Sequence, residues 1–179
     1  SKRNSHPDDI AFVYSMISEG KVERYRLESF EEAMVEFKHR SMALPDWVFW
    51  GRPRDDLGIF SMYYSIMKAD SLRAEYESDM NLKFDCVFRI RYDSLVHNEF
   101  LIEDHDIKGL NIPVAESDYG GINDRFAFGD SSAMSVYSSA YKNIVNLVER
   151  QGYQPEMILL NHLTDNKIVP RRPEFPVST

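Results

Sequence analysis

The sequence predicts an α/β domain in which helices flank a mixed β-sheet. The first observation is a long segment, residues 57–80, whose apolar residues recur at helical spacing on one broad face. The second is the run directly after it, residues 84–90, which is dense in apolar and β-branched residues, as a buried strand is. Further helical and short extended segments alternate along the chain, which is typical of this class. A length of 179 residues fits one domain, so residues 1–179 are interpreted as a single unit.

Capping residues mark the starts of the expected helices. Ser29 caps a helix, because Glu32 three residues later completes a capping box, and Asp130 begins another helix with the two serines after it. Helices are expected at residues 8–18, after Ser29, and at residues 57–80, 130–148 and 155–163. Strands are expected at residues 22–27, 84–90, 111–114, 126–128 and 168–169, with residues 84–90 as the central strand. A polar N-terminal segment (residues 1–9), an aromatic loop (42–56) and an extended tail (170–179) complete the chain.

The charge balance limits the partners. Lys and Arg number 21 against 29 Asp and Glu, which gives a net charge of −8 and argues against a nucleic-acid binder, whose affinity needs a basic surface. A few arginines still suffice to hold a small phosphorylated ligand. Cys86 is the single cysteine, which excludes a disulfide framework and a cysteine-based metal site. No run approaches the roughly 18–20 apolar residues of a membrane span, so a cytoplasmic protein is expected.

Two arginines and a carboxylate lie at the C-terminal end of the predicted central strand. Arg89, Arg91 and Asp93 alternate along the chain, so they share one face of a strand. In one interpretation Asp93 binds a divalent cation and the arginines hold phosphate, since ligands of open α/β sheets lie beyond the carboxyl ends of the strands. In the other, the segment is a solvated strand end with a structural ion pair. The residue types alone leave both open.

A glycine pair precedes a second polar group. Gly120 and Gly121 allow close approach to a ligand or a positive φ, and Asn123, Asp124 and Arg125 supply an amide, a carboxylate and a guanidinium. A ligand-binding loop and a plain glycine-rich turn both fit this pattern.

A third candidate is the helix expected at residues 155–163. Glu156 lies in its first turn, where the helix dipole favours a negative charge. His162, near its other end, is either a metal ligand or a core histidine.

Taken in order, these segments resemble a family of glycosyltransferases from large viruses, phages and bacteria with a GT-A-like, Rossmann-like fold. The resemblance covers residues 57–170 and rests on the Tyr-Ser-Ile and Lys-Ala of the long helix, on Arg-x-Arg-x-Asp at residues 89–93, and on Gly-Gly-Ile-Asn-Asp-Arg-Phe at residues 120–126. The Pro-Glu pair at residues 155–156, with the His-Leu pair at 162–163, resembles the family's closing helix. The family's N-terminal strand, with a Gly-Gln-x-Arg-like segment, has no match here, so we expect an incomplete or truncated domain.

The resemblance implies transfer of a sugar from a UDP- or GDP-sugar to a glycan, lipid or protein acceptor, with help from Mn²⁺ or Mg²⁺. Asp93, and with it His162, is then expected to bind the metal, although Arg91 stands where the family's Asp-x-Asp-type motif has its first carboxylate. Asp124 is expected to be the catalytic general base. The expected substrate-binding residues are Arg89, Arg91, Gly120, Gly121, Asn123, Arg125 and Glu156.

Two other function classes are weighed against this one. The first is a non-catalytic carbohydrate-binding or assembly domain that keeps the fold, which the single carboxylate at Asp93 and the missing N-terminal strand favour. The second is a phosphoesterase or nucleotidyl-transfer enzyme, which needs clustered carboxylates or histidines for two metals. The dispersed histidines of this sequence argue against that second class.

If Asp93 binds the cation, Asp93→Ala abolishes the Mn²⁺-dependent rise in melting temperature that a nucleoside diphosphate produces in the wild-type protein. The measurement is a thermal shift with UDP or GDP, with and without Mn²⁺. An unchanged shift in the variant contradicts the metal role of Asp93.

Overall fold

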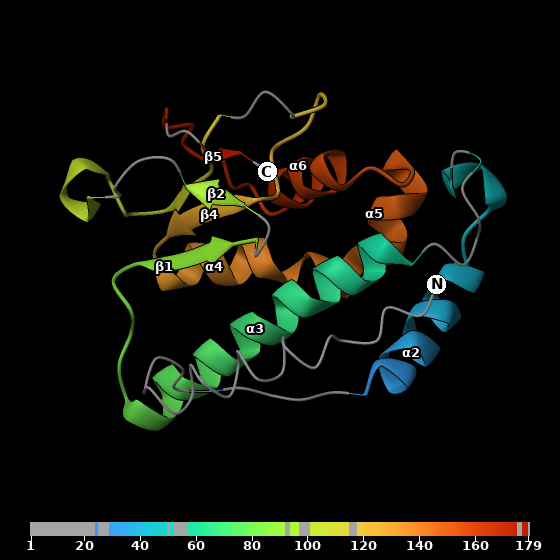
Figure 1. The fold of residues 1–179 in the computed structure, drawn as a ribbon, viewed down its shortest axis with the longest axis horizontal. Helices are drawn as coiled ribbons and strands as arrows, with labels where there is room; N and C mark the ends of the chain where they lie inside the picture. The colour runs from blue at the N-terminus through green and yellow to red at the C-terminus, as the bar shows by residue number, and fades with distance from the viewer. Residues whose placement is uncertain are drawn as a thin grey trace.

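The computed structural model describes residues 24, 29–49, 51, 57–91, 94–96, 101–114, 118–174 and 177–178. Its helices are α2 (Phe30–Met42), η1 (Asp46–Phe49), α3 (Gly58–Met80), η2 (Ile102–Asp104), α4 (Ser131–Ser138), η3 (Ser139–Asn143), α5 (Ile144–Gln151) and α6 (Pro155–Asp165), where η marks a 3₁₀ helix (Figure 1). Its strands are β1 (Val87–Ile90), β2 (Leu95–Val96), β3 (Leu110–Asn111), β4 (Phe126–Gly129) and β5 (Val177–Ser178). The expected elements at residues 8–18 and 22–27 lie outside the described residues, apart from Arg24.

Helix α3 crosses one side of the molecule and packs against α4 and η3 (Figure 1). The helix expected at residues 57–80 is confirmed, and so is the helix after Ser29, whose hydroxyl accepts a hydrogen bond from the backbone N–H of Glu32. Helix α3 ends at Asn81, which adopts a left-handed conformation with φ 50°. Its N-terminal half carries the buried apolar residues, so this half is the part that builds the core. None of the described helices is long and apolar enough to cross a membrane.

The main sheet has three strands in the order β1-β4-β3, and both pairings are antiparallel. Helices beside a small sheet agree with the α/β class, but the described sheet is antiparallel and not mixed as predicted. The prediction that residues 84–90 form the central strand is also wrong. Strand β4 is central and is buried at all four residues, whereas in β1 Phe88 is 45% and Ile90 49% exposed. A dense apolar run does not distinguish a central strand from an edge strand with one buried face. Parallel pairing among the described residues is limited to one bridge, between Asn111 and Arg171.

The C-terminal part departs from the expected elements at two places. The helix expected at residues 130–148 is divided into α4, η3 and α5, and the hydroxyl of Ser139 donates to the carbonyl of Val136 at the first junction. No strand forms at residues 168–169. Instead, residues 171–173, which we call the C-terminal strap, run beside the end of β3. Helix α6 is confirmed, with two residues more than expected.

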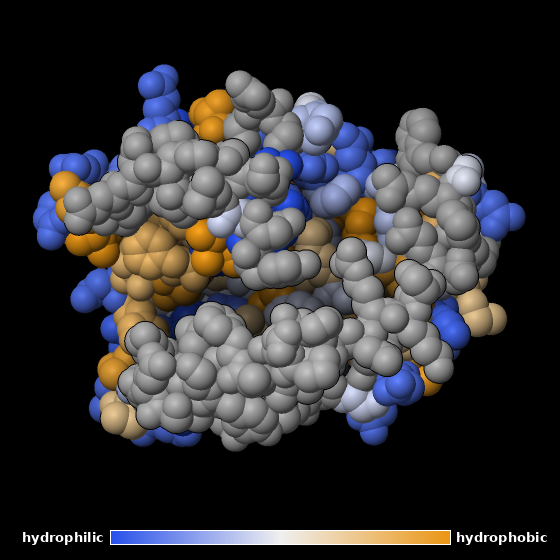
Figure 2. Space-filling view, in the orientation of Figure 1, coloured by the Kyte–Doolittle hydropathy of each residue, from blue (hydrophilic) through white to orange (hydrophobic). Residues whose placement is uncertain are grey.

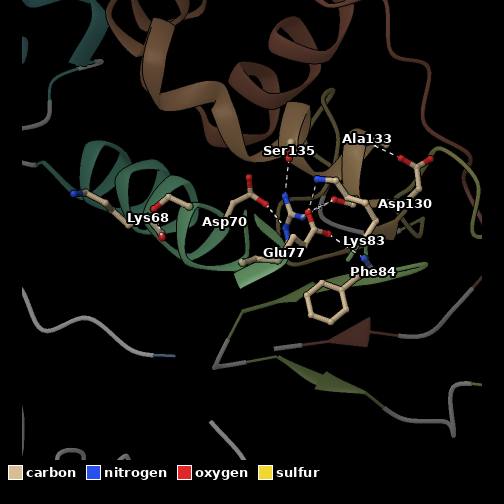
Figure 3. Close-up of polar contacts among 11 residues, drawn as sticks. Lys68, Asp70, Glu77, Lys83, Phe84, Asp130, Ala133 and Ser135 are labelled. Carbon is tan, nitrogen blue, oxygen red and sulfur yellow. Dashed lines mark hydrogen bonds and ion pairs between the residues drawn. The ribbon is translucent and has the colours of Figure 1, made fainter. Parts of the chain in front are cut away.

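A buried carboxylate ties α3 to the elements beside it (Figure 3). Glu77 is 1% exposed, and its Oε2 lies 2.8 Å from Nη1 of Arg73 and 2.7 Å from Nζ of Lys83. The same carboxylate accepts hydrogen bonds from the backbone N–H of Phe84 and from the hydroxyl of Ser131. Burial alone would raise the pKa of Glu77, but these hydrogen bonds and the charge of Arg73 lower it to about 2. The interaction links α3 to the first turn of α4 and to the segment that leads into β1.

Replacing Glu77 with Gln keeps the size of the side chain and removes its charge. Arg73 then lacks its buried counter-ion, so the free energy of unfolding at pH 7 falls by ~3 kcal/mol in urea denaturation. The matched control is Asp79→Asn on the same helix, because Asp79 is 64% exposed in its ion pair with Arg24. The control changes the free energy by less than ~1 kcal/mol.

The same interaction predicts an acid-sensitive stability. The pKa of Glu77 is about 2 in the folded chain against an ordinary value of 4.5, so the unfolded chain takes up the proton first as the pH falls. The stabilisation is complete above the ordinary value and is lost as the pH falls through the folded value. Glu77→Gln therefore loses less stability than the wild type over this acidic range. Acid-unfolding curves of the variant and the wild type that run parallel contradict this role of Glu77.

Candidate functional site

A groove of about 820 Å³ lies between α3 and β1. Figure 2 shows hydrophilic surface beside hydrophobic surface across the middle of this side of the molecule. Its described polar lining consists of Ser61, Ser65, Asp70, Arg73, Arg89, Arg91 and Ser138, and its apolar lining includes Met62, Ile66, Val87 and Met134. Proteins bind small ligands in hollows of about 300–1,000 Å³ with such mixed walls. The groove is therefore the candidate binding site.

Three guanidinium groups line this groove. Arg73 comes from α3 and is fixed by Asp70, Glu77 and the hydroxyls of Ser131 and Ser135. Arg89 and Arg91 come from β1 and its end, where they alternate with the more exposed Phe88 and Ile90, which line the groove as well. The prediction that Arg89 and Arg91 share one face agrees with this alternation.

The antiparallel pairing of β1 with β4 brings the two polar sequence motifs together. The end of β1 lies beside the start of β4, and the backbone N–H of Arg91 donates to the carbonyl of Arg125 at 2.8 Å. The Arg89 side chain donates to the backbone carbonyl of Asp124. Nη1 of Arg91 lies 3.6 Å from Oδ1 of Asp124, so the carboxylate and this guanidinium form an ion pair. Residues more than thirty positions apart in the sequence thus form one site.

Asp124 is buried and is only 3% exposed. A buried carboxylate needs a charged partner, and Arg91 supplies it. Through this ion pair Asp124 helps to hold Arg91, which lines the groove.

Two tyrosines near Arg89 and Asp124, Tyr63 and Tyr137, are further functional candidates, although the sequence pattern favours ordinary core positions for both. The hydroxyl of Tyr63 donates to the carbonyl of Pro155 at 2.7 Å, and the hydroxyl of Tyr137 is buried without a partner among the described residues. Burial raises the pKa of both phenols, and the negative charge of Asp124 raises them further. Both tyrosines therefore stay protonated beside Arg89 and Asp124.

The glycine loop, residues 118–125, is docked on the first turn of α6. A Cβ at Gly121 would lie 2.3 Å from the carbonyl carbon of Glu156, so this glycine is required by contact between two backbones. The backbone N–H of Ile122 donates to the carbonyl of Glu156. Gly120 has φ +80° and makes the turn itself. The fold itself therefore requires glycine at both positions, independently of any ligand.

The predicted residues Asn123, Arg125 and Glu156 also lie around Asp124. Asn123 is 2% exposed, and its amide oxygen accepts from the backbone N–H of Arg125. Glu156 is half-buried at the start of α6. Burial raises the pKa of its carboxyl group, Asp124 raises it further, and Arg125 and Arg91 oppose this rise. Asn123, Asp124, Arg125 and Glu156 therefore lie close together in the structure.

The predicted metal ligands are not brought together within the described residues. Asp93 lies outside them. His162 is buried in the core, with Nε2 2.7 Å from the carbonyl of Val136 and Nδ1 3.4 Å from the side-chain nitrogen of Asn166. Burial lowers the pKa of His162. Over the part of the chain that the structure describes, no three His, Cys, Asp or Glu side chains form a group that fits a metal ion.

The arrangement defines an α/β domain with an arginine-lined groove next to a buried carboxylate. Residues 10–176 match the family model described as a domain of unknown function, DUF7796. This match covers nearly the whole chain, so the chain belongs to that family. No curated protein and no solved structure matches the sequence.

The close contact at Gly121 predicts a large effect of one methyl group. Gly121→Ala forces the glycine loop away from the rigid first turn of α6 and lowers the free energy of unfolding by ~3 kcal/mol. Gly120→Ala is the comparison, because the nearest atom to its Cβ is Sδ of Met157 at 4.0 Å and its cost is the backbone strain alone, about 1 kcal/mol. Thermal or urea unfolding measures both, and an equal or smaller loss for Gly121→Ala contradicts the contact.

Proposed function

We propose that this chain is a glycosyltransferase domain with a GT-A-like fold that binds a nucleoside-diphosphate sugar in the groove between α3 and β1. One observation carries the proposal: Arg73, Arg89 and Arg91 line one groove, and a buried carboxylate, Asp124, forms an ion pair with one of them, Arg91. The resemblance of residues 57–170 to glycosyltransferases of large viruses, phages and bacteria supports the same function.

The arginines suit a diphosphate. A planar guanidinium donates two parallel hydrogen bonds to phosphate oxygens, and it keeps its charge at any physiological pH. Arg73 and Arg91 are 11% and 26% exposed, so they act in a partly desolvated groove, where their charges are screened less than in water. The apolar lining from Met62, Ile66 and Met134 suits the nucleoside part of such a donor.

The proposed reaction breaks the bond between the sugar's anomeric carbon and the diphosphate oxygen and forms a bond from that carbon to an acceptor hydroxyl oxygen. The leaving diphosphate gains negative charge, which Arg89 and Arg91 stabilise. The hydroxyl proton passes to a carboxylate, and Asp124 is the proposed acceptor of this proton. Binding of Mn²⁺ or Mg²⁺ by Asp93 remains a prediction from the sequence, and the roles of Arg89, Arg91 and Asp124 do not require it.

One observation favours the non-catalytic alternative, a carbohydrate-binding or assembly domain with the same fold. Asp124 is 3% exposed and paired with Arg91, which is also the arrangement of a carboxylate that only orients an arginine. Donor turnover distinguishes the two functions, because a binding domain retains affinity for the ligand and leaves the donor intact.

The test is a panel of UDP- and GDP-sugars, with and without Mn²⁺, in which mass spectrometry detects nucleoside diphosphate release and glycosylated product. We expect turnover with at least one donor. Asp124→Asn then lowers turnover by about 100-fold while donor affinity stays within a few-fold. The matched control is Asp165→Asn at the other end of α6, where the carboxylate forms an exposed ion pair with Arg150 at 2.6 Å. Equal turnover in Asp124→Asn and the wild type removes Asp124 from the role of base, and the absence of both turnover and binding with every donor overturns the proposed function.

A further inference from the structure

We infer that Arg172 of the C-terminal strap is a positioning residue for the groove. Through Asp118 it holds the glycine loop in the conformation that places Asp124 beside Arg89 and Arg91. That this conformation serves ligand binding rests on the proposed function, whereas the conformation itself follows from the contacts of Arg172, Asp118 and Asn123.

The C-terminal strap is fixed along the end of β3 by its backbone. The N–H of Arg171 donates to the carbonyl of Leu110, and the N–H of Ile112 donates to the carbonyl of Arg171, both at 2.9 Å. One step further, the N–H of Val114 donates to the carbonyl of Pro173 at 3.2 Å. The backbone on both sides of Arg172 is therefore fixed beside β3, although Arg172 lies far from the glycine loop in sequence.

Asp118 binds the Arg172 side chain and also holds the backbone of the glycine loop. Oδ2 of Asp118 forms an ion pair with Nη2 of Arg172, and both side chains are about one quarter exposed, at 25% and 28%. Oδ1 of the same carboxylate accepts the backbone N–H of Asn123 at 2.9 Å. The backbone carbonyl of Asp118 accepts the N–H of Gly121 at 2.7 Å. One residue thus closes the loop from within and connects it to the strap.

The side chain of Asn123 fixes the backbone around Asp124 through two hydrogen bonds. Its side-chain oxygen accepts the backbone N–H of Arg125, and its side-chain nitrogen donates to the carbonyl of Pro113, both at 2.8 Å. Nη2 of Arg172 also reaches the carbonyl of Pro113, at 3.4 Å. Because Asp124 lies between Asn123 and Arg125, its position depends on these contacts.

The contact of Arg172 is made through a single nitrogen, which gives the proposal a sharp test. Nη2 makes the bonds to Asp118 and Pro113, whereas Nε is buried without a partner among the described residues. A lysine ammonium is able to replace one donor nitrogen, but it cannot replace a guanidinium that binds through two. Arg172→Lys is therefore expected to retain the positioning that Arg172→Gln loses.

The experiment measures hydrogen–deuterium exchange by NMR at the backbone N–H groups of Asn123 and Arg125, in the chain without ligand. Arg172→Gln speeds exchange at both amides about tenfold, Arg172→Lys leaves it within about threefold of the wild type, and amides of β4 are unchanged in both. Arg171→Gln is the matched control on the same strap, because the Arg171 side chain pairs with Asp106 at the surface, where both are half exposed. Exchange in this control stays within about twofold of the wild type. In Asp118→Asn, where the ion pair is already lost, adding Arg172→Gln speeds exchange less than it does in the wild type.

Equal exchange in Arg172→Gln and the wild type, or equal acceleration in Arg171→Gln, overturns the inference. A calorimetric titration of the same variants with UDP and GDP connects it to the proposed function: wild type, Arg171→Gln and Arg172→Lys bind, and Arg172→Gln binds about tenfold more weakly. If the wild type binds neither nucleotide, the proposed function fails, while the exchange data still decide whether Arg172 positions the loop. If the nucleotides bind equally to all variants, the positioning of the glycine loop by Arg172 does not serve nucleotide binding.

Discussion

The buried carboxylate of Glu77 is the constraint on which the groove depends. It holds Arg73, Lys83, the backbone of Phe84 and the hydroxyl of Ser131 at once, so it joins α3 to the segment before β1 and to the start of α4. Residues of α3, β1 and α4 line the groove. A carboxylate that is 1% exposed is tolerated only because all of these donors face it. The arginine that it orients, Arg73, also lines the groove, so the interaction that stabilises the fold also places one charge of the site.

The second constraint is antiparallel pairing. Strands β1 and β4 run in opposite directions, and the end of one therefore lies beside the start of the other. This places Arg89 and Arg91 against Asp124, and the docking of Gly121 on α6 adds Glu156 to the same neighbourhood. The C-terminal strap reaches the loop through Arg172 and Asp118. Four segments from different parts of the sequence thus meet around Asp124 and the glycine loop.

Local signals in the sequence predicted the helices well and the sheet less well. The capping box at Ser29 and the periodicity of residues 57–80 act within a few turns, so α2 and α3 were predictable. The order of the strands depends on which apolar run is buried on both faces, and this is why β4 and not β1 is central. The polar motifs at residues 89–91 and 120–125 were predicted as sites, and their contact follows from strand pairing that no local signal specifies. Tyr137 and Arg172 were missed because a buried phenol and a tail arginine have no pattern until the fold places them.

The central claim is that the guanidinium groups of the groove bind the diphosphate of a nucleotide sugar. The most direct measurement is an NMR titration with UDP and GDP that follows the side-chain Nε–H signals of Arg73, Arg89 and Arg91, with the exposed Arg150 as an internal reference. The account predicts saturable shifts at the three groove arginines with one common affinity and no shift at Arg150. Signals that stay in place at all three arginines up to millimolar nucleotide, or that move only as much as the Arg150 signal, contradict it.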